Sequence, residues 1–118
     1  MPTWRLAKYR HNKSFSEVFD QSRYPDWAIT ALFYAALHLV DAVLERELGR
    51  TPDTHIRRSA WLHKAGMTRP IAGEYQRLRG LSEQARYDKE SEQFSQHDVQ
   101  AARGHLAAIE EQLLSRVV

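Results

Sequence analysis

The 118-residue chain is long enough for one domain with one core, and its 42% apolar and 27% charged residues differ clearly from a disordered composition. It contains no cysteine, which excludes disulfide bonds, thiolate zinc sites and a cysteine nucleophile. The formal net charge of +2 excludes a protein that binds nucleic acid by charge alone, although basic residues crowd the first dozen positions.

Helix signals begin near the start of the chain. The first predicted helix covers much of residues 4–21, and its clearest signal is Ser14, which has capping-box spacing to the glutamate three positions later. Pro25 and the following aspartate predict the start of a second helix, because proline is tolerated in the first turn and acids suit the positive helix end. This helix covers residues 26–48 and ends at Gly49, a residue type that commonly follows a helix.

Three more helices are predicted in the rest of the chain. Thr54 can cap a short third helix that runs to about residue 65, and Pro70 opens a fourth that runs to about residue 87. Ser95 starts a last helix with a continuous apolar face. No segment alternates as a strand would. The sequence therefore predicts an all-α fold, an antiparallel up-and-down helical bundle of four main helices plus a short helix, in a single domain over residues 1–118.

The sequence also predicts where the protein resides. The first residues lack the apolar stretch of a signal peptide. The longest apolar stretch, residues 31–40, contains His38 and is about half as long as a membrane span. We therefore expect a cytoplasmic protein with no membrane contact.

The second predicted helix is apolar over most of its surface but carries a narrow polar stripe. Tyr34, His38, Asp41 and Glu45 recur at i, i+4, i+7 and i+11 between two apolar faces. These side chains could satisfy one another, form a catalytic or binding site, or hold a metal together with His55. The repeated Glu-x-x-His pattern of di-iron bundles is absent, so we predict no metal and no other cofactor.

Three segments together resemble HEPN-like proteins, the higher eukaryote and prokaryote nucleotide-binding domains. The second helix contains a Tyr-Ala-x-x-His motif from Tyr34 to His38. His55 and Arg58 form a His-x-x-Arg at the start of the third helix, and the leucine-spaced fourth helix ends in an Ala-x-Tyr signature at residues 85–87. The order and spacing of these segments carry the resemblance, which covers most of the chain.

The resemblance implies an antiparallel four-helix bundle, commonly a homodimer, with an RNA- or nucleotide-related role. Many members of the family are metal-independent endoribonucleases of toxin–antitoxin, CRISPR and phage-defence systems, and others only bind. In active members an Arg-x4–6-His motif assists attack by the 2′-hydroxyl of the RNA. Histidine moves protons near neutral pH, and the permanently charged arginine stabilises the phosphorane.

The resemblance assigns catalysis to His55 and Arg58. The residues that would bind or orient the substrate are Tyr34, His38, Asp41, Arg86 and Tyr87. The sequence departs from the active pattern, because its Arg-x4-His matches are Arg50 with His55 and Arg58 with His63, which flank the third helix instead of lying in the last one. The competing hypothesis is a non-catalytic helical module that forms a homodimer or binds a neighbouring-gene partner protein, as an antitoxin does.

Overall fold

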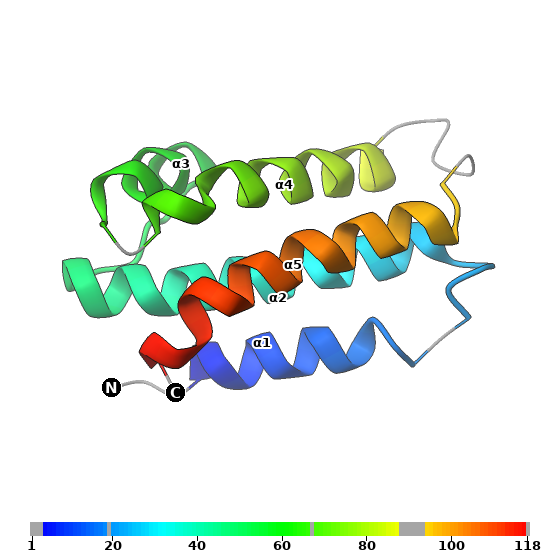
Figure 1. Ribbon diagram of the computed structural model, residues 1–118, viewed down its shortest axis with the longest axis horizontal. Helices are drawn as coiled ribbons and strands as arrows, with labels where there is room; N and C mark the ends of the chain where they lie inside the picture. Colours follow the sequence, from blue (N-terminus) through cyan, green and yellow to red (C-terminus); the bar gives the residue numbers. More distant parts are fainter. Residues whose placement is uncertain (1–3, 19, 67, 88–93, 118) are drawn as a thin grey trace.

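The computed structural model describes residues 4–18, 20–66, 68–87 and 94–117, and every regular element within these ranges is a helix. In chain order the elements are α1 (Trp4–Phe15), α2 (Pro25–Leu48), α3 (His55–Lys64), a 3₁₀ turn (Arg69–Ile71), α4 (Ala72–Tyr87) and α5 (Gln96–Val117). The predicted all-α fold class is therefore confirmed for the described part of the chain. Figure 1 shows α2 and α5 running side by side, with α1 below them and α3 and α4 above.

Helix α2 is the centre of this arrangement and packs against α1, α4 and α5. Both of its apolar faces are buried, the wide one around Leu32 and Val40 and the alanine face around Ala28 and Ala35. The other helices contribute one apolar face each to the same core. Their largest fully buried residues are Leu62, Ile71, Tyr75, Leu78, Leu106, Ile109 and Leu113.

The predicted limits of α2 are confirmed. Pro25 occupies the first turn, followed by Asp26. At the other end Gly49 adopts a left-handed conformation with φ of 77°, and its N–H donates to the carbonyl of Glu45. Glycine tolerates this conformation because it has no Cβ to clash with the backbone.

By length and composition α2 could also cross a membrane, but 78% of its apolar window is buried inside the protein.

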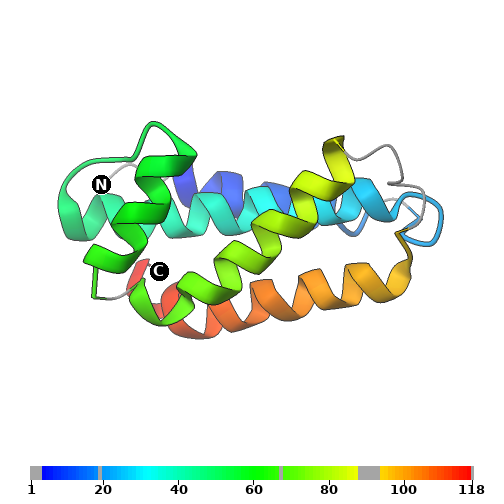
Figure 2. The same cartoon turned by 90° about the horizontal axis from the view of Figure 1, so that it is seen from above.

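The predicted caps of α3 and α5 are also confirmed. The Thr54 hydroxyl accepts a hydrogen bond from the Arg57 backbone N–H at 3.0 Å, which satisfies a free donor of the first turn. Ser95 caps α5 in the same way by accepting from the His97 N–H at 3.2 Å, and the Asp98 carboxylate accepts from the Ser95 N–H at 2.9 Å. Figure 2 shows the consequence for α3, which is held as a short separate helix beside the C-terminal part of α2.

The predicted capping box at Ser14 is wrong, because α1 ends where that signal was expected to start a helix. The segment is fixed by Ser16, which is fully buried and whose hydroxyl donates to the Lys13 carbonyl at 2.6 Å. The Ser16 carbonyl accepts from Gln21 Nε2 at 3.0 Å and from Arg103 of α5 at 3.2 Å. Side chains therefore occupy the carbonyl that a longer helix would have used, and the contact with α5 overrides the local signal.

Candidate functional site

A buried ion pair joins α3 to α2. Asp41 of α2 is fully buried, and Arg58 of α3 is 7% exposed. The Arg58 guanidinium binds the carboxylate through two bonds, Nε to Oδ1 at 2.7 Å and Nη2 to Oδ2 at 2.9 Å. Burial alone would lower the pKa of Arg58, but the hydrogen bonds and charge of Asp41 outweigh it and raise the pKa. A buried carboxylate needs such a partner, so this pair fixes the place of α3.

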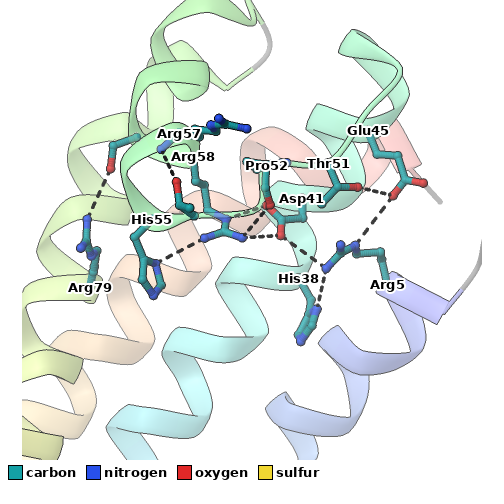
Figure 3. A network of polar contacts seen from close by, with 12 residues as sticks. Arg5, His38, Asp41, Glu45, Thr51, Pro52, His55, Arg57, Arg58 and Arg79 are labelled. Atoms are coloured by element: carbon teal, nitrogen blue, oxygen red, sulfur yellow. Dashed lines mark hydrogen bonds and ion pairs between the residues drawn. The ribbon is translucent and has the colours of Figure 1, made fainter.

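A second arginine extends the network to α1. Arg5 Nη1 lies 3.4 Å from Asp41 Oδ2, and Arg5 Nε lies 3.7 Å from Glu45 Oε2. Glu45 also accepts a hydrogen bond from the Thr51 hydroxyl at 3.2 Å. Two arginines and two carboxylates from α1, α2 and α3 thus balance one another (Figure 3). We call Arg5, His38, Asp41, His55 and Arg58 the Asp41 network.

Each arginine of the network also faces a histidine. Arg5 Nη1 lies 3.4 Å from His38 Nδ1, and Arg58 Nη1 lies 3.3 Å from His55 Nδ1 (Figure 3). Arginine has only donors, so both imidazole Nδ1 atoms must accept. This arrangement places the proton of each neutral ring on Nε2, the nitrogen directed away from its arginine.

The surroundings keep both histidines neutral. Burial lowers the pKa of His55, and the charges of Arg79, Arg58 and Arg86 lower it further against the smaller opposing effect of Glu83. Burial also lowers the pKa of His38, with Arg5, Lys8 and Arg58 acting in the same direction and Asp41 against them. Neither ring gains a stable proton at neutral pH, so the tautomer assigned by the hydrogen bonds persists there.

A cluster of one arginine and three aromatic rings lies next to His55. The Arg86 guanidinium is 5.0–5.6 Å from the ring centroids of Phe33, Tyr34 and Tyr87, and its Nη1 donates to the Tyr34 hydroxyl at 2.8 Å. Among the described residues no carboxylate lies within ion-pair distance of Arg86. The His55 ring packs at 6.2 Å from Phe33, which joins the cluster to the Asp41 network. We call Tyr34, His55, Arg86 and Tyr87 the Arg86 surface.

The seven predicted site residues therefore fall into two connected groups. His38, Asp41, His55 and Arg58 belong to the Asp41 network, while Tyr34, Arg86 and Tyr87 form the cluster beyond Phe33. Tyr87 is 75% exposed, so its ring is available at the surface. The geometry changes the expected part of Arg58, because a guanidinium already bound to Asp41 and His55 positions His55 and is not free to hold phosphate.

Two arginines of the site were missed at the level of sequence. Arg5 belongs to a basic N-terminal stretch in which no spacing distinguishes it from its neighbours, and only the position of α1 brings it to Asp41. Arg79 and Glu83 are four residues apart, the usual spacing of an ion pair on the surface of one helix, and Arg79 Nε does donate to Glu83 at 3.0 Å. A partial signal did exist, since a carboxylate on an almost wholly apolar helix predicts a cation from elsewhere in the fold.

A metal site at the polar stripe would need at least three histidine or acidic side chains close together. No such group exists among the residues that the structure describes. The oxygen atoms of Asp41 already face arginines.

The comparisons with known proteins add no relative. No family model, curated protein or solved structure matches the chain.

Proposed function

We propose that the chain is a HEPN-like helical domain that binds RNA or a nucleotide through the Arg86 surface. The observation that carries the proposal is that the three segments of the resemblance meet in space. Tyr34 of the Tyr-Ala-x-x-His motif accepts a hydrogen bond from Arg86 of the Ala-x-Tyr signature. His55 of the third segment packs on Phe33, which Arg86 also contacts.

The chemistry of the Arg86 surface supports an anionic ligand with aromatic groups. Arg86 is oriented by three rings, and a guanidinium group is a preferred binding partner of phosphate. The exposed Tyr87 ring offers a face on which a base can stack. The Nε2–H of the neutral His55 is a further hydrogen-bond donor to phosphate oxygen.

The tautomer of His55 favours binding over cleavage. A general base at Nε2 needs that nitrogen free of its proton, which would move the proton to Nδ1 and towards the Arg58 guanidinium. A general acid needs a protonated imidazole, which the lowered pKa disfavours. We therefore propose binding as the principal role. Metal-independent endoribonuclease activity would require His55 to leave Arg58 when the substrate binds.

The arrangement of the helices is part of the same proposal. We propose that α1, α2, α4 and α5 form the antiparallel up-and-down bundle of this family and that α3 is the additional short helix. The helix directions in Figure 1 support the up-and-down order, since α1 and α4 run one way along the molecule and α2 and α5 run the other way, which makes the packed pair α2 and α5 parallel. A homodimer and a cytoplasmic location complete the proposal.

A second candidate function is a non-catalytic interaction module that forms a homodimer or binds a neighbouring-gene partner protein. The pairing of charges within the Asp41 network favours it, because a satisfied network is also what a purely structural stripe would contain. In that case the polar stripe of α2 only holds α1 and α3 in place, and the Arg86 surface has no nucleic-acid ligand.

Binding of a labelled single-stranded RNA, followed by fluorescence anisotropy in the presence of a chelator, separates the two candidates. The informative variant is Arg86→Ala, with Arg77→Ala as its matched control, because Arg77 lies on the same helix but is exposed and paired with Glu74. We expect Arg86→Ala alone to weaken binding and to reduce the magnitude of the salt slope by about 0.7, the value of one single-strand phosphate contact.

Equal binding by the two variants, or no binding by the wild type, contradicts the nucleic-acid proposal. The same samples on a denaturing gel test cleavage. Loss of cleavage in His55→Ala, with unchanged thermal stability, would show that the endoribonuclease activity is real and that His55 leaves Arg58 during the reaction.

A further inference from the structure

A hollow on α1 lies outside the Arg86 surface and has no part in the function proposed so far. It has a volume of about 340 Å³ and is lined by Trp4, Ala7, Lys8 and His11. These residues follow one another at i, i+3, i+4 and i+7, so one face of α1 forms the whole lining. It is open to solvent, so it is a shallow surface groove and not an enclosed cavity. We call this feature the α1 hollow.

The aromatic wall of the α1 hollow is held in a fixed orientation. The Arg5 guanidinium lies over the Trp4 ring at 4.0 Å from its centroid, and the His38 ring meets Trp4 edge-on at 6.1 Å. Arg5 and His38 are themselves fixed by the Asp41 network. Trp4 is nevertheless 48% exposed, so a large rigid aromatic surface is presented to solvent instead of being used in the core.

The charge of the α1 hollow is positive. Lys8 and His11 are exposed, and in the described part of the chain neither side chain forms an ion pair with a carboxylate. Lys8 and Trp4 line the same hollow, so the ammonium lies on the same face of α1 as the indole ring. The small Ala7 leaves room between these larger side chains. An aromatic wall beside an unpaired cation matches a base and its phosphate.

The α1 hollow lies beside the polar stripe of α2 that also carries Tyr34 of the Arg86 surface. Trp4 contacts His38, and Tyr34 precedes His38 by four residues on the same stripe of α2. Four residues of helix span about 6 Å, roughly the distance between neighbouring nucleotides of a single strand. A strand whose phosphate lies at Arg86 therefore needs only a few nucleotides to bring a base to Trp4.

We propose that the α1 hollow is a second subsite of the nucleic-acid surface, in which one base of a single strand stacks on Trp4 and its phosphate contacts Lys8. This inference rests on the proposed function and names the part of the ligand that α1 binds. It also gives the Asp41 network a role at the site, because Arg5 and His38 hold the Trp4 ring in place for stacking.

Binding of a fluorescein-labelled oligoadenylate hexamer, and of the same hexamer built from tetrahydrofuran abasic nucleotides, tests the proposal. We expect Trp4→Leu to weaken binding of the base-bearing hexamer roughly 5- to 150-fold, the range observed for loss of one base–aromatic stack. Binding of the abasic hexamer should not change. Trp4→Phe should retain most of the affinity, and the control Trp27→Leu, at another exposed tryptophan, should retain all of it.

A second variant keeps the test decisive if Trp4→Leu fails to fold. Lys8→Gln removes an exposed charge and should weaken the base-bearing and abasic hexamers alike. Wild-type affinity in Trp4→Leu or in Lys8→Gln, together with weak binding by Arg86→Ala, would overturn the α1 subsite and leave the proposed function standing. Weak binding by Trp4→Leu with full affinity in Arg86→Ala would reject the Arg86 surface and keep the α1 hollow. No binding of either hexamer by the wild type overturns both.

Discussion

Replacing Arg58 by methionine provides the sharpest test of the Asp41 network. The substitution keeps an unbranched apolar stem close to that of arginine but removes the two hydrogen bonds, at 2.7 and 2.9 Å, that satisfy the Asp41 carboxylate. Asp41 is fully buried and cannot recover these bonds from water. Only Arg5, at 3.4 Å from one oxygen, then remains as a charged partner.

The expected loss of stability follows from the burial of the pair. Breaking a buried ion pair by removing one partner costs about 3–5 kcal/mol, and the remaining contact with Arg5 places Arg58→Met near ~3 kcal/mol. With an m-value of ~2 kcal/mol/M, the urea midpoint should fall by about 1.5 M. Such a loss is a large fraction of the ~5–15 kcal/mol that stabilises a typical domain.

The measurement is urea unfolding at pH 7.5 followed by far-ultraviolet circular dichroism. The matched control is Arg57→Met on the same helix, whose ion pair with Asp53 is exposed and contributes less than ~1 kcal/mol. The double variant Asp41→Leu/Arg58→Met should recover most of the loss, because it removes the unpaired buried carboxylate while Arg5 keeps its contact with Glu45. If Arg58→Met is no less stable than Arg57→Met, Asp41 is not the buried, arginine-dependent group described above.

Two further changes test other parts of the structure. Because the folded-state pKa values of His38 and His55 lie below the usual 6.5, the unfolded chain binds more protons, and the free energy of unfolding should fall as the pH drops from about 7 to 5. Urea titrations of the wild type and of His38→Gln should show a smaller pH dependence in the variant, and an equal dependence would refute the assignment for His38. Gly49→Ala should lower the free energy of unfolding by about 1–2 kcal/mol, because the φ of 77° strains any side chain. Its control, Gly104→Ala on the open surface of a helix, should raise the free energy of unfolding by up to ~1 kcal/mol. Thermal unfolding measures both, and equal shifts of the two variants would contradict the prediction.

Local signals predicted most of the helix limits because the atoms that produce them are adjacent in sequence. Pro25 and Gly49 limit α2, and Thr54 caps α3, through contacts within four residues. The signal at Ser14 failed for the opposite reason. Its segment is held by Arg103, 87 residues away from Ser16, and no local pattern contains that contact.

The candidate site was predictable where its residues belong to one helix and not where partners arrive from another. The stripe of Tyr34, His38 and Asp41 follows from helix periodicity alone. Helix periodicity does not predict that Arg5 and Arg58 share Asp41. Many arginines have the right charge, and only the packing of the helices selects these two. The sequence also assigned a catalytic role to Arg58, whereas in the structure its guanidinium is buried against Asp41.

The Asp41 network connects a buried carboxylate with two histidines, one on each side of it. The same carboxylate holds Arg5 and Arg58, and each arginine in turn fixes the Nδ1 atom of one histidine. Both Nε2–H groups are therefore hydrogen-bond donors before a ligand binds. Binding of an acceptor then needs no free energy to change the tautomer. An arrangement of this kind suits recognition of an anion better than proton transfer, since a base must release the proton that the network holds on Nε2. The geometry thus accounts for two histidines and two arginines held together around one buried carboxylate.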